Sequence, residues 1–291
     1  DVPELDRLKD KRVAIVGTGA TSIQAVPHLA AYCKDLYVVQ RTPSCVDTRP
    51  NPPTDEAWLK SLKPGWQKER IANFQRYAQE VPLPDDVDLV CDFWTEINRN
   101  LLAWNQADPI VDFTMEKFME RREVVDYQVM ERFRRRVDET IKDPELAEKL
   151  KAYYRFLCKR PLSSDSFYPA FNRANVTLVD VSETRGLQQL TETGFIANGE
   201  EFAADCVIFA SGFEATSALE RRWGIDRIEG RGGVSLYDLW RNGPQTLHGT
   251  MAHGFPNQFY IGYIQGGLNA SVTEQFGRQG EHIAHIIAET M

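Results

Sequence analysis

Two glycines separated by one residue, Gly17 and Gly19, are well suited to bind an anion. They follow the apolar run 13–16 and precede a stretch with helical spacing, so a strand, a tight turn and a helix N-terminus are expected in that order. Gly17 permits the turn, and Gly19 lets a pyrophosphate approach unpaired N–H groups at the positive end of the helix dipole. Ser22 occupies the third position of this fingerprint, where glycine or alanine is usual. The alternative interpretation is that both glycines are ordinary turn residues.

A cationic residue, Arg41, follows the apolar run 35–40 about twenty residues after the glycines. In a dinucleotide-binding fold, the residue at this strand end contacts the adenine ribose. A carboxylate there selects NAD, whereas an arginine accommodates the 2′-phosphate of NADP. Because no acidic residue competes with Arg41, the pattern predicts NADP(H) as the cofactor. A solvated surface arginine is the alternative.

These residues require an α/β scaffold. We expect strands at 13–16 and 35–40 around a helix over 21–32, and a further strand at 175–180. Three short strands, at 187–190, 194–197 and 201–203, are expected to form a meander. A fully buried strand is expected to begin at Cys206 and end near Gly212. It should share one sheet with the first strand.

The long middle part of the chain has a helical period. A proline-rich linker at 47–56 leads into residues 54–155, which contain no strand pattern, and Thr54 is the expected N-cap. The arginine clusters 121–122 and 134–136 alternate with acids, which predicts a solvated helix face. The aromatic residues of this block are expected to lie in the core. A few of them could instead form the wall of a substrate cavity.

The last part of the chain repeats the order of the first. A strand is expected at 257–262, a glycine turn at 265–269 and a helix at 271–290, capped by Ser271 or Thr273. This second strand–glycine–helix pattern suggests another cofactor contact. An ordinary helix packed on the edge of a sheet is the alternative.

Composition excludes several classes of partner. The formal net charge of −8 argues against nucleic acid and against an anionic membrane surface. The five cysteines are scattered without metal-ligand spacing, which is typical of a reduced, cytoplasmic protein without a structural zinc site. No apolar run has membrane-spanning length. The chain begins at Asp1 rather than Met, which suggests excision from a longer protein.

Six short motifs occur in an order typical of one enzyme family. They are GTGATS (17–22), QRTP (40–43), CKRP (158–161), FNRANVTLVD (171–180), FASGF (209–213) and GFPN (254–257). Together they resemble the Baeyer–Villiger monooxygenases, which are class B flavoprotein monooxygenases, over essentially the whole chain. The family's N-terminal FAD-binding fingerprint is absent from this sequence. The resemblance therefore implies that the chain is the C-terminal part of such an enzyme, inactive without the missing FAD-binding half of the same polypeptide.

The resemblance implies a domain organisation. Residues 1–46 and 156–213 would form a Rossmann-like NADP-binding domain, and 47–155 a long all-α insertion. Residues 214–291 would be the C-terminal part of the FAD-binding domain of a flavoprotein with two dinucleotide-binding domains.

The resemblance also implies a reaction. NADPH, FAD and O2 would be used to insert one oxygen atom next to a ketone carbonyl, giving an ester or lactone. The family's oxidant is a peroxide that must stay anionic, so a permanently charged guanidinium beside it is needed. Arg160 matches the family's active-site arginine, and Lys159 matches a neighbour of the NADP phosphates. Without the resemblance, the two would be a surface basic pair.

The predicted site therefore has one catalytic residue, Arg160, and no metal ligand. In the FASGF motif, Ser211 stands where the family more often has threonine, and this motif is expected to join the two nucleotide-binding domains. The predicted cofactor-binding residues are Gly17, Thr18, Gly19, Ala20, Thr21, Ser22, Gln24, Arg41, Thr42, Lys159, Ala210, Ser211 and Gly212.

Three other functions stay open. An NADPH-dependent flavoprotein monooxygenase that oxidises nitrogen or sulfur would not be expected to carry the helical insertion or the Lys159–Arg160 pair. A flavin-independent NADP dehydrogenase is disfavoured because there is no Tyr-x-x-x-Lys pair, and the late histidines 248, 253, 282 and 285 are expected to be surface or packing residues. A non-catalytic NADP-binding module is the third possibility, since the flavin fingerprint is absent.

Overall fold

The computed structural model describes residues 3–79, 83, 85–213, 217–265 and 271–291. The chain divides into two compact units. Unit 1 comprises Asp1–Leu62 and Arg99–Gly212, and unit 2 comprises Lys63–Asn98 and Phe213–Met291. The predicted division into 1–46 with 156–213, 47–155 and 214–291 stays a prediction. None of the described helices has the length and apolar character needed to cross a membrane.

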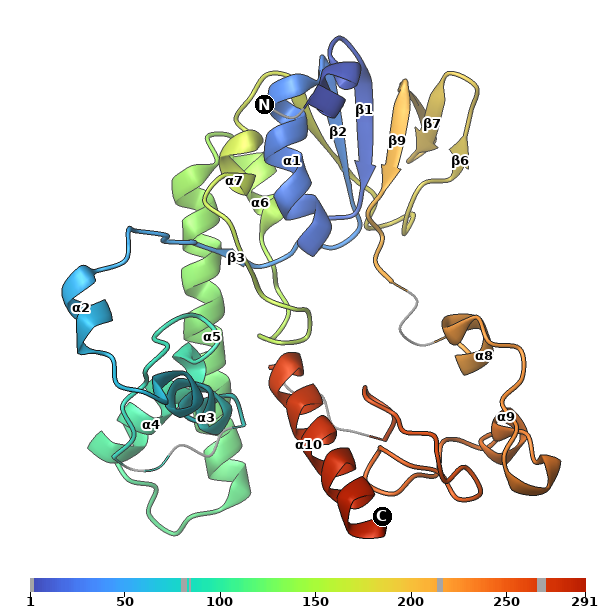
Figure 1. The fold of residues 1–291 in the computed structure, drawn as a ribbon. Coiled ribbons are helices and arrows are strands. Elements are labelled where there is room, and N and C mark those ends of the chain that lie inside the picture. Colours follow the sequence, from blue (N-terminus) through green and yellow to red (C-terminus); the bar gives the residue numbers. More distant parts are fainter. Residues whose placement is uncertain (1–2, 80–82, 84, 214–216, 266–270) are drawn as a thin grey trace. The chain divides into compact units, whose positions relative to one another are not determined.

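Unit 1 is built on a four-stranded sheet with the order β5-β2-β1-β9 (Figure 1). The strands are β1 (Arg12–Val16), β2 (Asp35–Gln40), β5 (Val176–Asp180) and β9 (Cys206–Phe209). All neighbouring strands are parallel, and Val13 pairs with Leu36 on one side and Cys206 on the other. This confirms the predicted strands and their common sheet. The carboxyl ends of all four strands consequently lie at one edge, where such sheets bind ligands.

The prediction that the strand from Cys206 is fully buried is wrong. Among the described strands β9 pairs with β1 alone, so it is an edge strand. Its first three residues are half-buried and Phe209 is 60% exposed. An apolar run is equally compatible with a central strand and with an edge strand, so the sequence pattern did not distinguish them.

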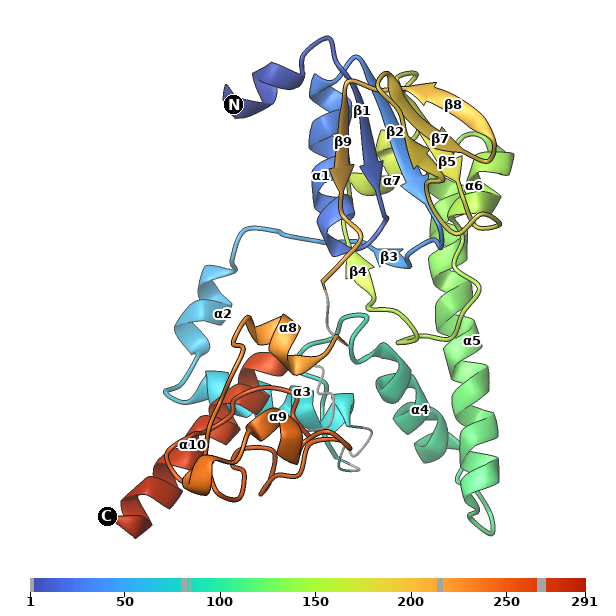
Figure 2. The same ribbon diagram turned by 90° about the vertical axis from the view of Figure 1, so that its right-hand side faces the viewer.

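Helices cover one face of the sheet, and a β-meander covers the other (Figure 2). Because side chains alternate along a strand, Val13 and Ile15 pack on the helical side while Ala14 packs on the meander side. The helical layer contains α1 (Ala20–Tyr32), α5 (Met115–Thr140), α6 (Pro144–Leu150) and α7 (Phe167–Ala170). The meander is antiparallel, as predicted, and consists of β6 (Gln189–Leu190), β7 (Gly194–Ala197) and β8 (Glu200–Ala203).

The middle of the chain is helical, as predicted. It contains α2 (Glu56–Ser61), α3 (Trp66–Ala78), α4 (Glu96–Ala107), α5 and α6. A short parallel pair flanks it, formed by β3 (Val46–Asp47) and β4 (Leu162–Ser163). The predicted N-cap Thr54 is wrong, because Asp55 is the N-cap of α2 and its carboxylate accepts from the N–H groups of Ala57 and Trp58.

The predicted solvated face of arginines is wrong for three residues of unit 1. Arg134 is buried and donates to the carbonyl oxygen of Ala152 at 3.0 Å. Arg136 donates to the carbonyl oxygens of Val46 and Ser164, and the side chain of Arg121 is only 13% exposed. A guanidinium carries five donors, so it can satisfy the carbonyls of loops that cross the helix. Alternation of charge did not reveal these contacts because the loops are distant in sequence.

Unit 2 has its own core, in which Leu236, Trp240, Phe255 and Tyr260 are buried together. It contains α3 together with α8 (Leu219–Trp223), α9 (Leu236–Leu239) and α10 (Val272–Thr290). Among the described residues, Pro3–Leu8 (η1) and Arg231–Gly233 (η2) form 3-10 helices. The predicted terminal helix is confirmed as α10, and Ser271 is its N-cap.

The predicted strand at 257–262 is wrong. Within the described part of unit 2, this segment forms one isolated bridge, between Met251 and Phe259, and no ladder. Apolar alternation is not sufficient for a strand when no extended partner runs beside it. Of the predicted glycine turn at 265–269, all but Gln265 lies outside the described residues.

Candidate nucleotide-binding site

The turn between β1 and α1 can be made only with glycine at position 17. Gly17 has a φ of +113°, and a Cβ placed there would lie 2.5 Å from the carbonyl oxygen of Ala210. The N–H of Ala210 donates to the carbonyl oxygen of Val16 at 2.9 Å. The predicted residues Gly17 and Ala210 are therefore neighbours, although 193 positions separate them in the sequence.

The start of α1 is open to a ligand. Gly19 is the N-cap, it offers no capping side chain, and apart from the adjoining backbone no described atom lies within 4 Å of a Cβ placed there. The first turn carries no acidic residue, so no carboxylate competes for the positive end of the helix dipole. Thr21 and Gln24 are exposed, and Gln24 donates to the carbonyl oxygen of Ala20 at 2.8 Å.

Ser22 lies on the opposite side of this turn of helix. Its side chain is completely buried, and its hydroxyl has no hydrogen-bond partner among the described residues. The third position of the fingerprint requires close packing of helix on strand, and a serine is small enough to meet that requirement. Ser22 is thus placed for packing, whereas the surroundings of Gly19 are open.

The loop after β2 is tied to the glycine turn by two hydroxyl groups. Thr18 donates to the carbonyl oxygen of Thr42 at 3.0 Å, and Ser44 donates to the carbonyl oxygen of Thr18 at 2.7 Å. Gln40 is buried, and its side-chain amide donates to the carbonyl oxygen of Lys149 at 2.6 Å. This amide group is therefore already bonded within the protein. Arg41 is exposed and forms no ion pair with a described residue.

The loop that carries Lys159 and Arg160 leads into β4, which pairs with β3, the strand that follows the loop after β2. Leu162 faces Val46 in parallel register, and the N–H of Leu162 donates to the carbonyl oxygen of Cys45 at 3.1 Å. Lys159 is half-buried and Arg160 is exposed.

Three basic side chains belong to the two loops that lead into the β3–β4 pair: Arg41 lies between β2 and β3, and Lys159 and Arg160 lie just before β4. None of them forms an ion pair within the described part of the chain. Their charges are therefore not neutralised by a described carboxylate. Ser211 and Gly212 follow β9 at the carboxyl edge of the sheet and are exposed. The predicted roles of all these residues stay predictions.

Two residues that shape this site were not predicted. Ser44 ties the two loops together, and the hydroxyl oxygen of Tyr154 accepts from the N–H of Cys45 at 3.0 Å. Burial raises the pKa of Tyr154. Ser44 could have been found, since it directly follows the QRTP motif. No sequence pattern indicates the role of Tyr154, because its hydrogen-bond partner Cys45 lies 109 positions away.

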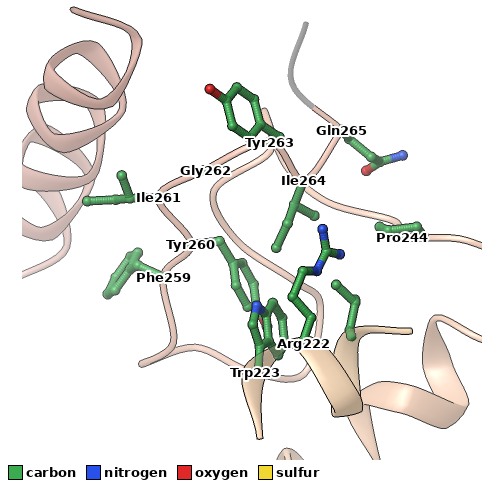
Figure 3. Close-up of a pocket in the computed structure, with 11 residues that line it drawn as sticks. Arg222, Trp223, Pro244, Phe259, Tyr260, Ile261, Gly262, Tyr263, Ile264 and Gln265 are labelled. Carbon is green, nitrogen blue, oxygen red and sulfur yellow. The ribbon is translucent and has the colours of Figure 1, made fainter. Parts of the chain in front are cut away.

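Unit 2 contains a separate pocket of about 550 Å³ (Figure 3). Its walls are mostly apolar and aromatic, with Trp223 stacked on Tyr260 at a ring-centroid distance of 6.0 Å. Burial raises the pKa of Tyr260 to about 12. The predicted NADP-site residues all belong to unit 1, so this pocket is not formed by them.

The late histidines of unit 2 make one contact that was not expected. Nδ1 of His248 lies 3.0 Å from Nε2 of His282; His248 is exposed and His282 is half-buried. Within the described residues, no group of three or more His, Cys, Asp or Glu side chains could hold a metal ion.

Comparison with known proteins gives the family. No protein-family model matches the chain. The chain is 42% identical over 283 residues to the Baeyer–Villiger monooxygenase ATR8 of Stachybotrys chlorohalonatus, which covers 97% of this chain and 45% of that protein. Among solved structures, it resembles a polycyclic ketone monooxygenase from Thermothelomyces thermophila, with a TM-score of 0.83, 38% identity, and coverage of 97% of this chain and 46% of that one.

A second solved structure was crystallised with both nucleotides. OTEMO in complex with FAD and NADP matches with a TM-score of 0.69 and 25% identity, covering 98% of this chain and 52% of that one. The chain spans about half the length of the relatives it matches. Together with the ordered motifs, these matches show that the chain belongs to the Baeyer–Villiger monooxygenase family.

Proposed function

We propose that this chain provides the NADP(H)-binding site of a Baeyer–Villiger monooxygenase. The whole protein would use NADPH, FAD and O2 to insert one oxygen atom next to a ketone carbonyl, giving an ester or lactone. Its remaining half would hold most of the FAD site. The observation that carries this proposal is the open glycine turn together with Arg41 directly after β2, in a chain 42% identical to a Baeyer–Villiger monooxygenase. The same turn would serve an enzyme that oxidises nitrogen or sulfur, but the relatives favour ketone oxidation.

The residues present fit NADP(H). The N-terminus of α1 would hold the pyrophosphate, since Gly19 leaves the backbone accessible and no side chain caps the helix. Arg41 and Thr42 would bind the 2′-phosphate, and Lys159 would neutralise a phosphate from the facing loop. The guanidinium of Arg160 would stabilise negative charge that develops on the reacting oxygen atoms. Bound FAD would supply the transfer of electrons from NADPH to O2.

The proposal is tested by cofactor preference. Arg41→Ala is expected to raise the NADPH dissociation constant by about tenfold to a hundredfold, because a charge-assisted contact contributes about 1.5–3 kcal/mol. The NADH dissociation constant should barely change, since NADH lacks the 2′-phosphate. Both constants can be measured by titration calorimetry on the full chain.

Arg173 offers a matched control. It is also exposed, but it precedes the amino end of β5 and therefore belongs to the opposite edge of the sheet. Arg173→Ala should leave both dissociation constants unchanged. Equal losses for NADPH and NADH in Arg41→Ala would remove Arg41 from the site.

A further inference from the structure

A buried carboxylate attaches the loop of Lys159 and Arg160 to α5. Asp126 is only 4% exposed, and its two oxygens accept from the N–H of Phe156 at 3.1 and 3.3 Å. Burial raises the pKa of this carboxyl, against the opposing effects of the Phe156 N–H and of Arg122 and Arg155. Burying a carboxylate costs free energy. A residue whose role was only to fill this space would therefore be expected to be apolar.

The backbone just after this contact is strained. Leu157 has a φ of +64°, a left-handed conformation that costs a residue with a Cβ about 1–2 kcal/mol. The N–H of Cys158 donates to the carbonyl oxygen of Arg155 at 3.0 Å, which closes the turn. Such strain persists only where the surroundings fix the chain.

The turn is fixed from both sides. Before it, Arg134 of α5 donates to the carbonyl oxygen of Ala152 at 3.0 Å. At the turn, the ring of Phe156 packs on Phe133 of α5, with centroids 6.2 Å apart. After it, Leu162 is held in β4. Lys159 and Arg160 lie between the last two anchors, so their backbone position depends on where Phe156 is held.

We propose that Asp126 is a positioning residue: by holding the Phe156 N–H, it fixes the turn that leads into Lys159 and Arg160. This rests on the proposed function in one respect, namely that these two residues act on bound NADP(H). The positioning itself can be measured without any ligand.

The first measurement reports on the loop alone. Cys158 is exposed and lies in the loop, and Cys91→Ser removes the other exposed cysteine. A nitroxide label on Cys158 should be restrained in this background and should gain mobility, seen by electron paramagnetic resonance, when Asp126→Ala is added. Asp126→Asn keeps an acceptor oxygen and a similar volume, so it should restore most of the restraint. If Asp126→Ala does not fold, the label mobility of Asp126→Asn is compared with that of the Cys91→Ser background instead, and the expected increase is smaller.

The second measurement links the loop to the ligand. Asp126→Ala is expected to raise the NADPH dissociation constant by about tenfold, with partial rescue in Asp126→Asn. If Asp126 acts through the loop, the effects of Asp126→Ala and Lys159→Ala should not add in the double variant, whereas those of Asp126→Ala and Arg41→Ala should.

Asn172 provides the structural control. Like Asp126, it ties α5 to the backbone, since it donates to the carbonyl oxygen of Thr140 and accepts from the N–H of Lys142. Asn172→Ala should lower the melting temperature and leave both the label mobility and NADPH binding unchanged. An immobile label in Asp126→Ala would overturn the proposal, and so would a mobile label with unchanged NADPH binding. A failure of the proposed function looks different, because NADPH binding would then be insensitive to Arg41→Ala as well.

Discussion

At the scale of single residues, the two glycines of the turn have separate tasks. Gly17 is required by the fold, since it has a positive φ and a Cβ would meet the carbonyl oxygen of Ala210. Gly19 has an ordinary φ of −81° and an open surrounding, so the fold itself does not require a glycine there. Under the proposed function, a glycine at this position lets the pyrophosphate approach the backbone closely.

This difference predicts opposite behaviour of two alanine variants. Gly17→Ala should lower the free energy of unfolding by at least about 1–3 kcal/mol, because the backbone strain and the contact with Ala210 both act on the folded state. Gly19→Ala should keep or slightly raise the stability while weakening NADPH binding. Urea denaturation and NADPH titration of both variants provide the test. A Gly19→Ala protein with unchanged NADPH affinity would contradict the assignment of the turn to the pyrophosphate.

The buried, unpaired hydroxyl of Ser22 leads us to expect that replacing this serine with alanine does not destabilise the protein. An unsatisfied buried polar group costs about 1–3 kcal/mol, and alanine removes it without changing the close packing of α1 on the sheet. Ser22→Ala should therefore leave the melting temperature unchanged or raise it. Thr18→Val is the comparison, since it removes a hydroxyl that does donate, to Thr42, and should lower the melting temperature. A marked loss of stability in Ser22→Ala would show that the hydroxyl has a partner.

At the scale of elements, the edge strand β9 is fastened to β1 by one ion pair. The backbone N–H and the guanidinium of Arg12 both donate to the carboxylate of Asp205, at 2.8, 3.1 and 2.7 Å. These bonds hold the pKa of Asp205 well below its ordinary value of 3.8. This contact lies at the amino ends of the strands, so it secures the alignment of β9 without entering the nucleotide edge.

The lowered pKa of Asp205 fixes the sign of a pH effect. A carboxyl that is more acidic in the folded state binds fewer protons there, so its stabilisation is complete above pH 3.8 and is lost as the pH falls toward the folded pKa. Asp205→Asn should therefore lower the melting temperature at pH 7, and its difference from the unmodified chain should shrink below pH 3.8. Glu200→Gln, at an exposed position on β8, should show no such convergence. A difference that grew in acid would refute the assignment.

At the scale of the whole molecule, the chain joins two compact units through more than one crossing. Its described nucleotide turn lies in unit 1, and the relatives it matches are about twice its length. We therefore expect this chain to bind NADPH but to retain little or no flavin on its own. Purification in the presence of FAD, followed by an absorption spectrum, checks this expectation. A stoichiometric yellow chromophore would show that the chain holds far more of the flavin site than proposed.

The sequence by itself determined the parallel strands, the helical block, the meander and the terminal helix. It could do so because these depend on local periodicity and on turn residues such as Gly17. The ordered motifs also identified the family that the comparisons show.

Tertiary structure alone decided the features that depend on distant partners. Strand β9 is partly exposed because only one described strand, β1, pairs with it. Residues 257–262 do not form a strand because no described segment pairs with them in a ladder. The burial of Arg134 and the contact of Asp126 with Phe156 likewise bring together segments 18 and 30 positions apart. Such contacts leave no periodic trace in a single sequence, because their energy belongs to a pair of residues rather than to a stretch of chain.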